Sequence, residues 1–439
     1  MEATATRIGI LMTLYAMAGC STAHKEGQAV IHTQAAAQAF HEAASLCQAE
    51  GGRLWGQSLC GPMMFADQAT HQAVLNGPSA GAVRDGTLFR LDLPAGTGIA
   101  NTSTEVGGKL WTMIMWPLPQ DATDRSVLMM HESFHRLQPA LGLQGSSGLG
   151  TNVHLDARDG RVWLKAELHA LSSALRSGAE ARRNALSDAL LFRAYRRSLW
   201  PKAASQERGL ELNEGLAEST GIDAALSDSA SRVKAALADL ASCEVSPSFV
   251  RSFAYGTGPA YAELLDSAEP AWRRSVHVDF DFGSAVAAAY RVTLPALSKA
   301  GAETALARWG GPDIVAQEDA RQKTIEERNV RYTGLFLEGP TVLFRLVRMS
   351  ITFNPREVAS FENHGTVYGT VELSDEWGTL KVESGAALIS ENFREVLVPA
   401  SADTTPEHPA GKGWNARLAK GYSLAPDPSK PGSFNVVPK

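Results

Sequence analysis

Hydrophobic and polar residues follow two different periods along this chain, and each period predicts a different kind of element. Residues 28–52 are rich in alanine and end in a glycine pair, which predicts one helix. Residues 54–118 contain short apolar or alternating segments separated by Gly, Pro, Asn and Asp, which is typical of a small sheet. Apolar residues recur at helical spacing from about 161 to 300 and alternate with a period of two from about 333.

The helical region is expected to contain several separate helices. One face of an amphipathic helix carries Leu164, Leu168, Leu171 and Leu175. A second helix is expected at 180–200, and a third at 205–220 with Gly221 as its C-terminal cap. Further helices are expected at 227–242, 256–267 and 284–308, and the charged stretch 318–331 indicates a solvated helix or a domain boundary.

These patterns together predict an α+β protein. Residues 21–120 form an N-terminal α/β region with a small mixed sheet, residues 121–332 form a mainly helical region, and residues 333–439 form a C-terminal β domain. The chain has 439 residues, with 41 basic and 47 acidic side chains. Its surface therefore has no excess of positive charge that would attract nucleic acid, and we expect no such partner.

The N-terminus has the pattern of a secretory signal. One basic residue, Arg7, precedes an apolar run at residues 8–18, which is too short to span a bilayer. The segment Met17-Ala18-Gly19-Cys20 resembles the bacterial lipoprotein signal, which implies that residues 1–20 form a signal peptide and that Cys20 is lipidated. By the same resemblance, Ser21 implies sorting to the outer membrane, facing the periplasm or the exterior. The alternative is a secreted protein without lipid, cut near Ala18.

Three further cysteines, Cys47, Cys60 and Cys243, would then lie in a compartment that permits disulfides. Cys47 and Cys60 close a short loop, and we favour that pair. The sequence leaves Cys243 open as a partner of either one.

The strongest chemical motif is HESFH at residues 131–135. Residues four apart in a helix lie on the same face, so His131 and His135 present both imidazoles about 6 Å apart along the axis, where one ion can bind them. Glu132 lies one position further round and suits a general base acting on metal-bound water. The alternative is an ordinary helix with incidental histidines.

A second motif, ELNEGLAE at 211–218, resembles the Asn-Glu-Gly-x-Ala signature of the gluzincins, the thermolysin-like and aminopeptidase N-like zinc peptidases. The resemblance implies that Glu214 is the third zinc ligand, and it extends to Asn213, Gly215 and Ala217. Glu218 lies one turn further on and is expected to accept a hydrogen bond from a ligating histidine. Its alternative is a surface carboxylate, and Glu211 matches nothing in the signature.

The spacing departs from the family, because Glu214 follows His135 by 79 positions. Two helices inserted as a hairpin between the metal helices would account for the gap. Glu167 and His169, within that gap, are competing ligands, but the leucines around them define a buried face from which they need not reach a metal.

Other candidate residues lie on both sides of these motifs. Tyr255, in FAYGTGPAYAELLD, matches the gluzincin tyrosine that hydrogen-bonds the oxyanion, with a core aromatic as its alternative. The strand at 110–118 is expected to pair with substrate, whereas GIANTS at 98–103 lacks the glutamate that binds the free amine in aminopeptidases. Asp156 and Asp159 offer oxygens to calcium but fit a turn and a helix cap better.

The sequence therefore predicts an envelope-anchored, zinc-dependent peptidase acting on a peptide or protein substrate. Zinc is bound by His131, His135 and Glu214, with Glu132 as the base and Tyr255 as the oxyanion donor. Two alternatives stay open. One is a non-catalytic lipoprotein whose zinc site is structural or vestigial, and the other is a zinc amidase that cleaves cell-wall peptides.

Overall fold

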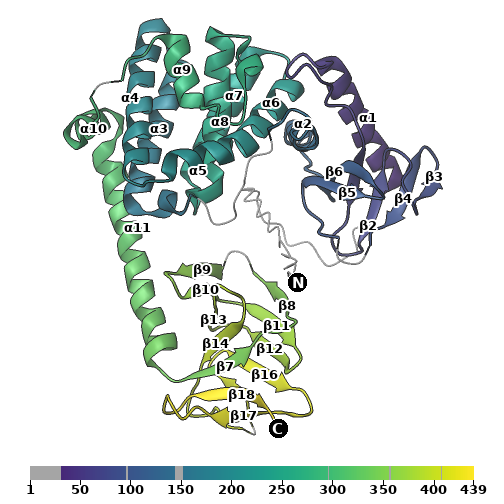
Figure 1. The fold of residues 1–439 in the computed structure, drawn as a ribbon, viewed down its shortest axis with the longest axis vertical. Helices are drawn as coiled ribbons and strands as arrows, with labels where there is room; N and C mark the ends of the chain where they lie inside the picture. Colours follow the sequence, from purple (N-terminus) through teal and green to yellow (C-terminus); the bar gives the residue numbers. More distant parts are fainter. Residues whose placement is uncertain (1–30, 95–96, 144–151, 295, 355–356, 407) are drawn as a thin grey trace, which may run out of the picture. The chain divides into compact units, whose positions relative to one another are not determined.

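The computed structural model describes residues 31–439 apart from 95–96, 144–151, 295, 355–356 and 407, so the predicted signal peptide and Cys20 lie outside the described residues. The chain forms two compact units, the first ending at Glu318 and the second covering Asp319–Lys439 (Figure 1). The expected α+β class is confirmed. Among the helices described, none is both long and apolar enough to cross a bilayer.

The first unit begins with a helix on a six-stranded sheet. Helix α1 (Thr33–Glu50) ends at Gly51, whose φ of 62° is left-handed, as the glycine pair predicted. The sheet has the order β3-β4-β2-β1-β6-β5, in which only β1 and β6 pair in parallel. Its strands are β1 (Met63–Ala66), β2 (Gln72–Leu75), β3 (Val83–Asp85), β4 (Leu88–Asp92), β5 (Thr102–Val106) and β6 (Lys109–Met115). Phe40 of α1 stacks on Phe65 of β1 with ring centroids 4.2 Å apart, which joins helix and sheet in one core.

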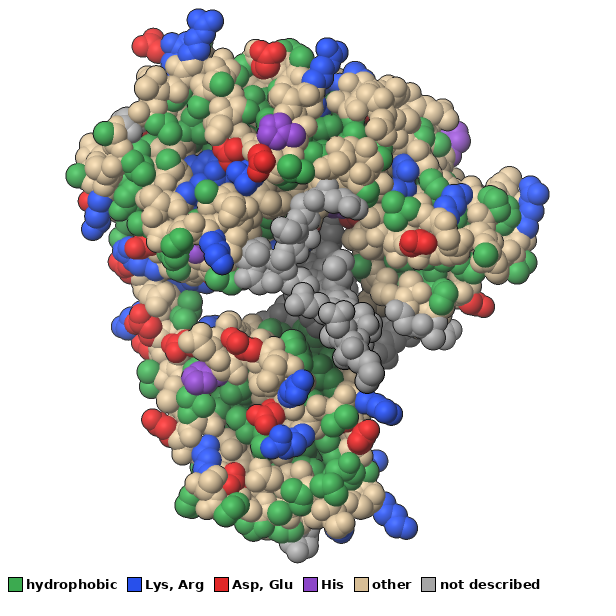
Figure 2. All heavy atoms as spheres, viewed as in Figure 1, with side chains coloured by type: hydrophobic (Ala, Val, Ile, Leu, Met, Phe, Trp, Pro, Cys, Tyr) green, Lys and Arg blue, Asp and Glu red, His purple; other side chains and the backbone are tan. Residues whose placement is uncertain are grey.

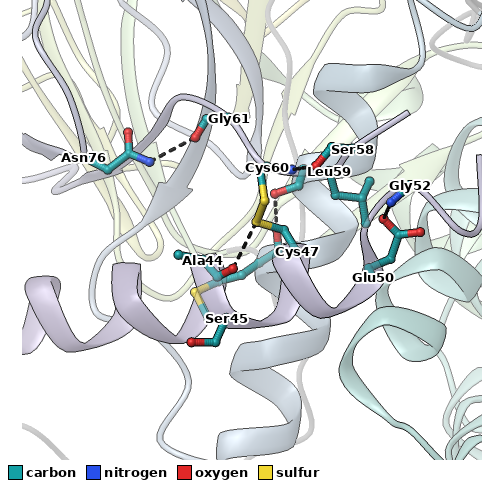
Figure 3. The surroundings of a disulfide bond; sticks show 12 residues. Ala44, Ser45, Cys47, Glu50, Gly52, Ser58, Leu59, Cys60, Gly61 and Asn76 are labelled. Carbon is teal, nitrogen blue, oxygen red and sulfur yellow. Dashed lines mark hydrogen bonds between the residues drawn. A yellow bond between two sulfur atoms is a disulfide. The ribbon is translucent and has the colours of Figure 1, made fainter. Parts of the chain in front are cut away.

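A disulfide joins Cys47 of α1 to Cys60 ahead of the sheet (Figure 3). Arg136, which follows the second histidine of the motif, donates to the main-chain oxygens of Leu59 (2.9 Å) and Cys60 (3.1 Å). These hydrogen bonds connect the disulfide-linked loop to the helix that carries the HESFH motif. Cys243 is buried and unpaired, which resolves the choice that the sequence left open.

The rest of the first unit is helical. Helices α3 and α4 lie side by side as an antiparallel pair (Figure 1), so the hairpin expected between the two motifs is present. The helices are α2 (Ala122–Leu137), α3 (Arg158–Arg176), α4 (Ala179–Ser198), α5 (Ala203–Leu210), α6 (Leu216–Ala225), α7 (Ser229–Glu244), α8 (Phe249–Ala268), α9 (Phe282–Tyr290), α10 (Lys299–Leu306) and α11 (Gly311–Tyr332). Short helical turns are η1 (Val153–Asp156), η2 (Glu211–Gly215), η3 (Trp272–Ser275) and η4 (Ala307–Trp309).

Three of the expected helix boundaries are wrong. The helix expected to stop at Gly221 continues to Ala225, because Gly221 serves close packing instead of capping. A Cβ at Gly221 would lie 2.7 Å from the Val127 oxygen and 3.3 Å from the His131 Cβ, both on α2. Helix α8 begins at Phe249, earlier than expected, after the cap Ser248. The single helix expected at 284–308 is divided into α9 and α10.

The second unit carries two antiparallel-dominated sheets after the π-helical turn η5 (Thr333–Glu338). The sheet orders are β17-β18-β7-β14-β13-β10-β9 and β15-β16-β12-β11-β8. The strands are β7 (Thr341–Arg345), β8 (Ser350–Phe353), β9 (Val358–Phe361), β10 (Gly365–Tyr368), β11 (Val371–Asp375), β12 (Gly378–Val382), β13 (Ala387–Ile389), β14 (Glu395–Pro399), β15 (Ala410–Gly411), β16 (Trp414–Leu418), β17 (Tyr422–Pro426) and β18 (Phe434–Pro438).

The alternation that predicted these strands has a direct structural basis. In β11, Val371 and Leu373 are buried in the core of the second unit, while Glu372 between them is exposed. The sequence placed the domain boundary at 332/333, whereas the units divide at 318/319, within α11, because that helix continues without a break to Tyr332. On the face shown in Figure 2, basic and acidic side chains are interspersed, and no region of one sign dominates.

Candidate metal centre

Helix α2 places the two histidines of the motif at a buried position. Asp121 caps its N-terminus by accepting hydrogen bonds from the Thr123 and Asp124 main-chain nitrogens. The side chains of His131 and His135 are 1% and 13% exposed, and their Nε2 atoms lie 3.0 Å apart. The expected shared face is therefore present, and it points into the protein.

Glu214 reaches the same point from η2, a π-helical segment between α5 and α6. Its Oε2 lies 3.6 Å from His131 Nε2 and 3.5 Å from His135 Nε2. These three residues form one of two groups of candidate metal ligands among the described residues, the other being Asp223, Glu263 and Asp266. Despite the 79-residue separation, the fold brings together the three ligands that the sequence named.

Both imidazoles are oriented by acceptors on their far side. His131 Nδ1 lies 2.7 Å from Glu218 Oε2, and His135 Nδ1 lies 2.8 Å from Gln138 Oε1. The orientation of the Gln138 side-chain amide is fixed, because its nitrogen donates to the main-chain oxygens of Leu212 (3.1 Å) and Asn213 (3.0 Å). A carboxylate and an amide oxygen can only accept, so each Nδ1 carries a proton.

This tautomer assignment leaves both Nε2 atoms with lone pairs that face each other and the Glu214 carboxylate. Such an arrangement is repulsive until a positive charge lies among the three atoms. A proton on one Nε2 atom can supply this charge. Burial lowers the pKa of His131, but its hydrogen bonds to Glu214 and Glu218 outweigh burial and raise that pKa well above its usual value. A metal ion bound by the three atoms can also supply this charge.

Gln138 was not found from the sequence, although a signal was present. It stands three residues after His135, so it lies on the same side of the helix as the second histidine. No family signature named above includes this position. The sequence also did not predict the π-helical turn η2. This turn supplies the main-chain oxygens of Leu212 and Asn213 that accept hydrogen bonds from Gln138.

Glu132 is buried beside the histidines but does not belong to the ligand group. Its residue is 2% exposed, and its Oε2 has no hydrogen-bond partner among the described residues. Burial raises the pKa of the Glu132 carboxyl, although the imidazoles of His131 and His135 act in the opposite direction. A buried oxygen without a partner is costly, so the site is arranged for a further group at this point.

Helix α8 contributes two side chains that contact Glu214. The Tyr255 hydroxyl donates to Oε2 at 2.5 Å, and the Tyr255 ring stacks on His131 with centroids 5.8 Å apart. Arg251 donates to Oε1 at 2.9 Å, where Asn213 Nδ2 also donates at 3.0 Å. Tyr255 therefore lies at the centre, as expected from the sequence, but its partner in this structure is the ligand carboxylate.

Close contact between two glycines allows α8 to approach η2 in this way. A Cβ at Gly258 would lie 2.4 Å from the Gly215 Cα, so the two main chains touch with no side chain between them. The gluzincin signature includes Gly215, whereas no pattern in the sequence singled out Gly258. In the structure both glycines lie where two helical segments cross.

The competing ligands are engaged elsewhere. Glu167 is fully buried and accepts from Arg193 at 3.3 Å and from the Tyr261 hydroxyl at 2.7 Å. His169 uses one ring nitrogen on Glu244 at 2.7 Å. Neither residue belongs to a group of candidate metal ligands within the described part of the chain.

The candidate calcium residues also have other partners. Asp156 accepts from the main-chain nitrogen of Phe249 at 2.7 Å and from the Ser248 hydroxyl at 2.6 Å, so it caps α8. Asp159 pairs with Arg158 at 2.6 Å. The turn expected at Asp159-Gly160 is wrong, because both residues lie in the first turn of α3, whose N-cap residue Ala157 makes no side-chain cap hydrogen bond.

Among the described residues, the sheet has an unpaired edge beside the motif helix, but at a different strand from the expected one. Strand β6, which directly precedes α2, is paired on both sides, with β1 and with β5. Strand β5 is the edge of the sheet and packs against α2.

Comparison with protein-family models, with curated proteins and with solved structures found no match. Any function must therefore be inferred from the geometry and chemistry of the site itself.

Proposed function

We propose that this protein is a zinc-dependent peptidase, bound to the cell envelope through lipid on Cys20. The observation that carries the proposal is the triangle formed by His131 Nε2, His135 Nε2 and Glu214 Oε2, with sides of 3.0, 3.5 and 3.6 Å. The point equidistant from these atoms lies about 2.0 Å from each, which is close to the usual distances from zinc to His nitrogen and to carboxylate oxygen.

The same geometry favours a catalytic site over a structural one. Structural zinc sites have four protein ligands, whereas catalytic sites have three and leave a position for water. No fourth His, Cys, Asp or Glu joins the group within the described residues. Glu132, with its unpartnered oxygen, lies beside the group on the same helix.

The proposed mechanism divides the work among the residues of the site. Zinc, when bound, supplies a Lewis acid that polarises the scissile carbonyl and makes water a nucleophile at neutral pH. Glu132 would take the proton from that water and return it to the leaving amine, a role for which its buried carboxylate lies on the same helix as the two histidines. Tyr255 donates to the oxyanion once its hydroxyl has exchanged Glu214 for the substrate oxygen.

Substrate binding is proposed at the free edge of β5. An extended peptide can add to an edge strand through main-chain hydrogen bonds, and β5 packs directly against the helix that carries the site. We therefore propose a peptide or protein substrate, and no nucleic acid, as the partner. An amide bond in a cell-wall peptide would use the same chemistry and remains the second substrate class to test.

The first experiment measures zinc per chain by elemental mass spectrometry on protein that starts at Ser21. About one zinc is expected in the parent, and clear loss is expected in Glu214→Ala. Glu244→Ala is the matched control, because Glu244 pairs with His169 away from the site and should leave zinc unchanged. No zinc in the parent would contradict the proposal.

The second experiment separates catalysis from metal binding. Glu132→Gln is expected to retain zinc and to lose hydrolysis by at least about 100-fold, since the amide cannot accept the proton. Peptide libraries and murein fragments are the two substrate sets. Full activity in this variant would refute the mechanism, and zinc without hydrolysis of either set would favour a structural site.

A further inference from the structure

Arg251 is 42% exposed and contacts the candidate metal centre through Glu214, with one hydrogen bond to the described residues. We propose that this guanidinium binds a carboxylate of the substrate close to the scissile bond. This inference rests on the proposed peptidase function and deepens it by naming the substrate class. The carboxylate is either the C-terminal group of a peptide or an acidic side chain.

The position of Arg251 is set by α8. It stands one helical turn before Tyr255, and both side chains extend to the Glu214 carboxylate. The Glu214 side chain is 7% exposed, whereas that of Arg251 is 42% exposed. Arg251 therefore reaches from solvent to the buried Glu214 carboxylate.

Most donors of this guanidinium remain free. An arginine side chain has five N–H groups, and one nitrogen of Arg251 donates to Glu214 Oε1. No other partner of this side chain occurs among the residues that the structure describes. The remaining N–H groups, in a planar fork, are available to an acceptor that enters from solvent.

Holding Glu214 does not by itself require an arginine. Oε1 already accepts from Asn213, and Oε2 accepts from Tyr255. A neutral donor would complete this set without placing a second, exposed cation beside the cationic metal that the site is proposed to hold. The excess capacity matches a planar anion, since guanidinium and carboxylate form two parallel hydrogen bonds.

The test measures binding, so it does not depend on hydrolysis. Succinate carries two carboxylates, one for the metal and one for Arg251, whereas succinamate has the same size with one carboxylate replaced by an amide. Isothermal titration of the zinc-loaded chain, from Ser21 onward, should show succinate binding at least about tenfold more tightly. Equal affinity in the parent protein, or no succinate binding, would overturn the inference.

Two variants assign that preference to Arg251. Arg251→Met should bring the ratio of the two affinities to about one, and Arg251→Lys should give an intermediate ratio, because it keeps the charge but not the fork. Arg274→Met, at an exposed arginine outside α8, is the matched control and should retain the parent ratio. The inference would also be overturned if Arg251→Lys kept the parent ratio of succinate to succinamate affinity while Arg251→Met either kept it too or failed to bind zinc.

Peptide substrates then distinguish the two sources of the carboxylate. A preference for free C-termini over C-terminal amides indicates the terminal group, and a preference for Asp over Asn next to the scissile bond indicates a side chain. If no peptide is hydrolysed while the succinate preference depends on Arg251, then the carboxylate site stands and the peptidase proposal fails.

Discussion

The side-chain nitrogen of Gln138 lies 3.0 Å from the main-chain oxygen of Asn213, so one side chain joins the motif helix to the turn that carries Glu214. Its oxygen at the same time accepts from His135 Nδ1 at 2.8 Å. Asn213 lies in the π-helical turn η2, next to Glu214. The second and third candidate ligands are thus positioned by the same amide group.

Replacing Gln138 should therefore weaken zinc binding without removing a ligand. In Gln138→Ala, we expect zinc affinity to fall about 10- to 100-fold, because His135 loses the partner that sets its tautomer and η2 loses its link to α2. Competition with a chromogenic chelator measures the affinity. Gln48→Ala, at an exposed position of α1, is the control, and equal affinities in the two variants would contradict the expectation.

The close approach of α6 to α2 at Gly221 gives a second prediction. Gly221→Ala should lower the free energy of unfolding by about 1–3 kcal/mol, because its Cβ would press on the Val127 main chain, which cannot move aside as a flexible side chain could. It should also weaken zinc binding, since α6 carries Glu218 and follows Glu214. Urea unfolding and zinc titration are the measurements.

Gly209→Ala is the matched control for this substitution. Gly209 is also helical, but a Cβ there meets nothing within 4 Å. Alanine should leave stability unchanged or raise it by up to about 1 kcal/mol, as expected for an unhindered helical position. A similar loss in both variants would show that helix geometry, and not contact with α2, is responsible.

A buried ion pair supports the segment that carries Glu214. Arg193 donates to Glu211 at 2.8 Å, and their side chains are 3% and 1% exposed. Arg193→Met would leave the buried Glu211 with Arg197, 3.5 Å away, as its remaining cationic partner, so we expect a loss of about 3–5 kcal/mol in the free energy of unfolding. Arg208→Met, whose partner Asp279 is largely exposed, should cost no more than about 1 kcal/mol. Urea unfolding would contradict this ranking if the two losses were equal.

The acidic group formed by Glu263, Asp223 and Asp266 should make stability depend on pH. Burial, followed by the charge of Asp223, raises the pKa of Glu263 to about 8, against the attraction of Arg232. Between the usual carboxyl pKa of 4.5 and about 8, the folded protein holds a proton that the unfolded chain releases. Stability should therefore fall as pH rises through this window, by up to about 1.4 kcal/mol per pH unit.

Glu263→Gln tests that linkage, because glutamine has the shape and the donor of the protonated acid. The variant should flatten the stability profile between pH 5 and 8 and should be more stable than the parent at about pH 8 and above. Thermal unfolding across this range is the measurement. Parallel profiles for the parent and the variant would show that Glu263 is not responsible.

The sequence alone determined the features that depend on residues close together in the chain. Helical spacing placed His131 and His135 on one face, alternation gave the strands of the second unit, and the glycine pair at Gly51 ended the first helix. The resemblance to the gluzincin signature named Glu214, and helical spacing from Glu214 named Glu218; the structure places both beside the histidines. Each of these rests on a local period or a short motif.

Only the tertiary structure decided how distant segments meet. The pairing of Cys47 with Cys60, the role of Gly221 in helix contact and the link from Gln138 to Asn213 all join residues on separate elements. Patterns within short stretches of sequence cannot predict these contacts, because the partner of a side chain depends on how whole helices pack against one another. For the same reason, the sequence could not single out Arg251, whose proposed role depends on its position between solvent and Glu214.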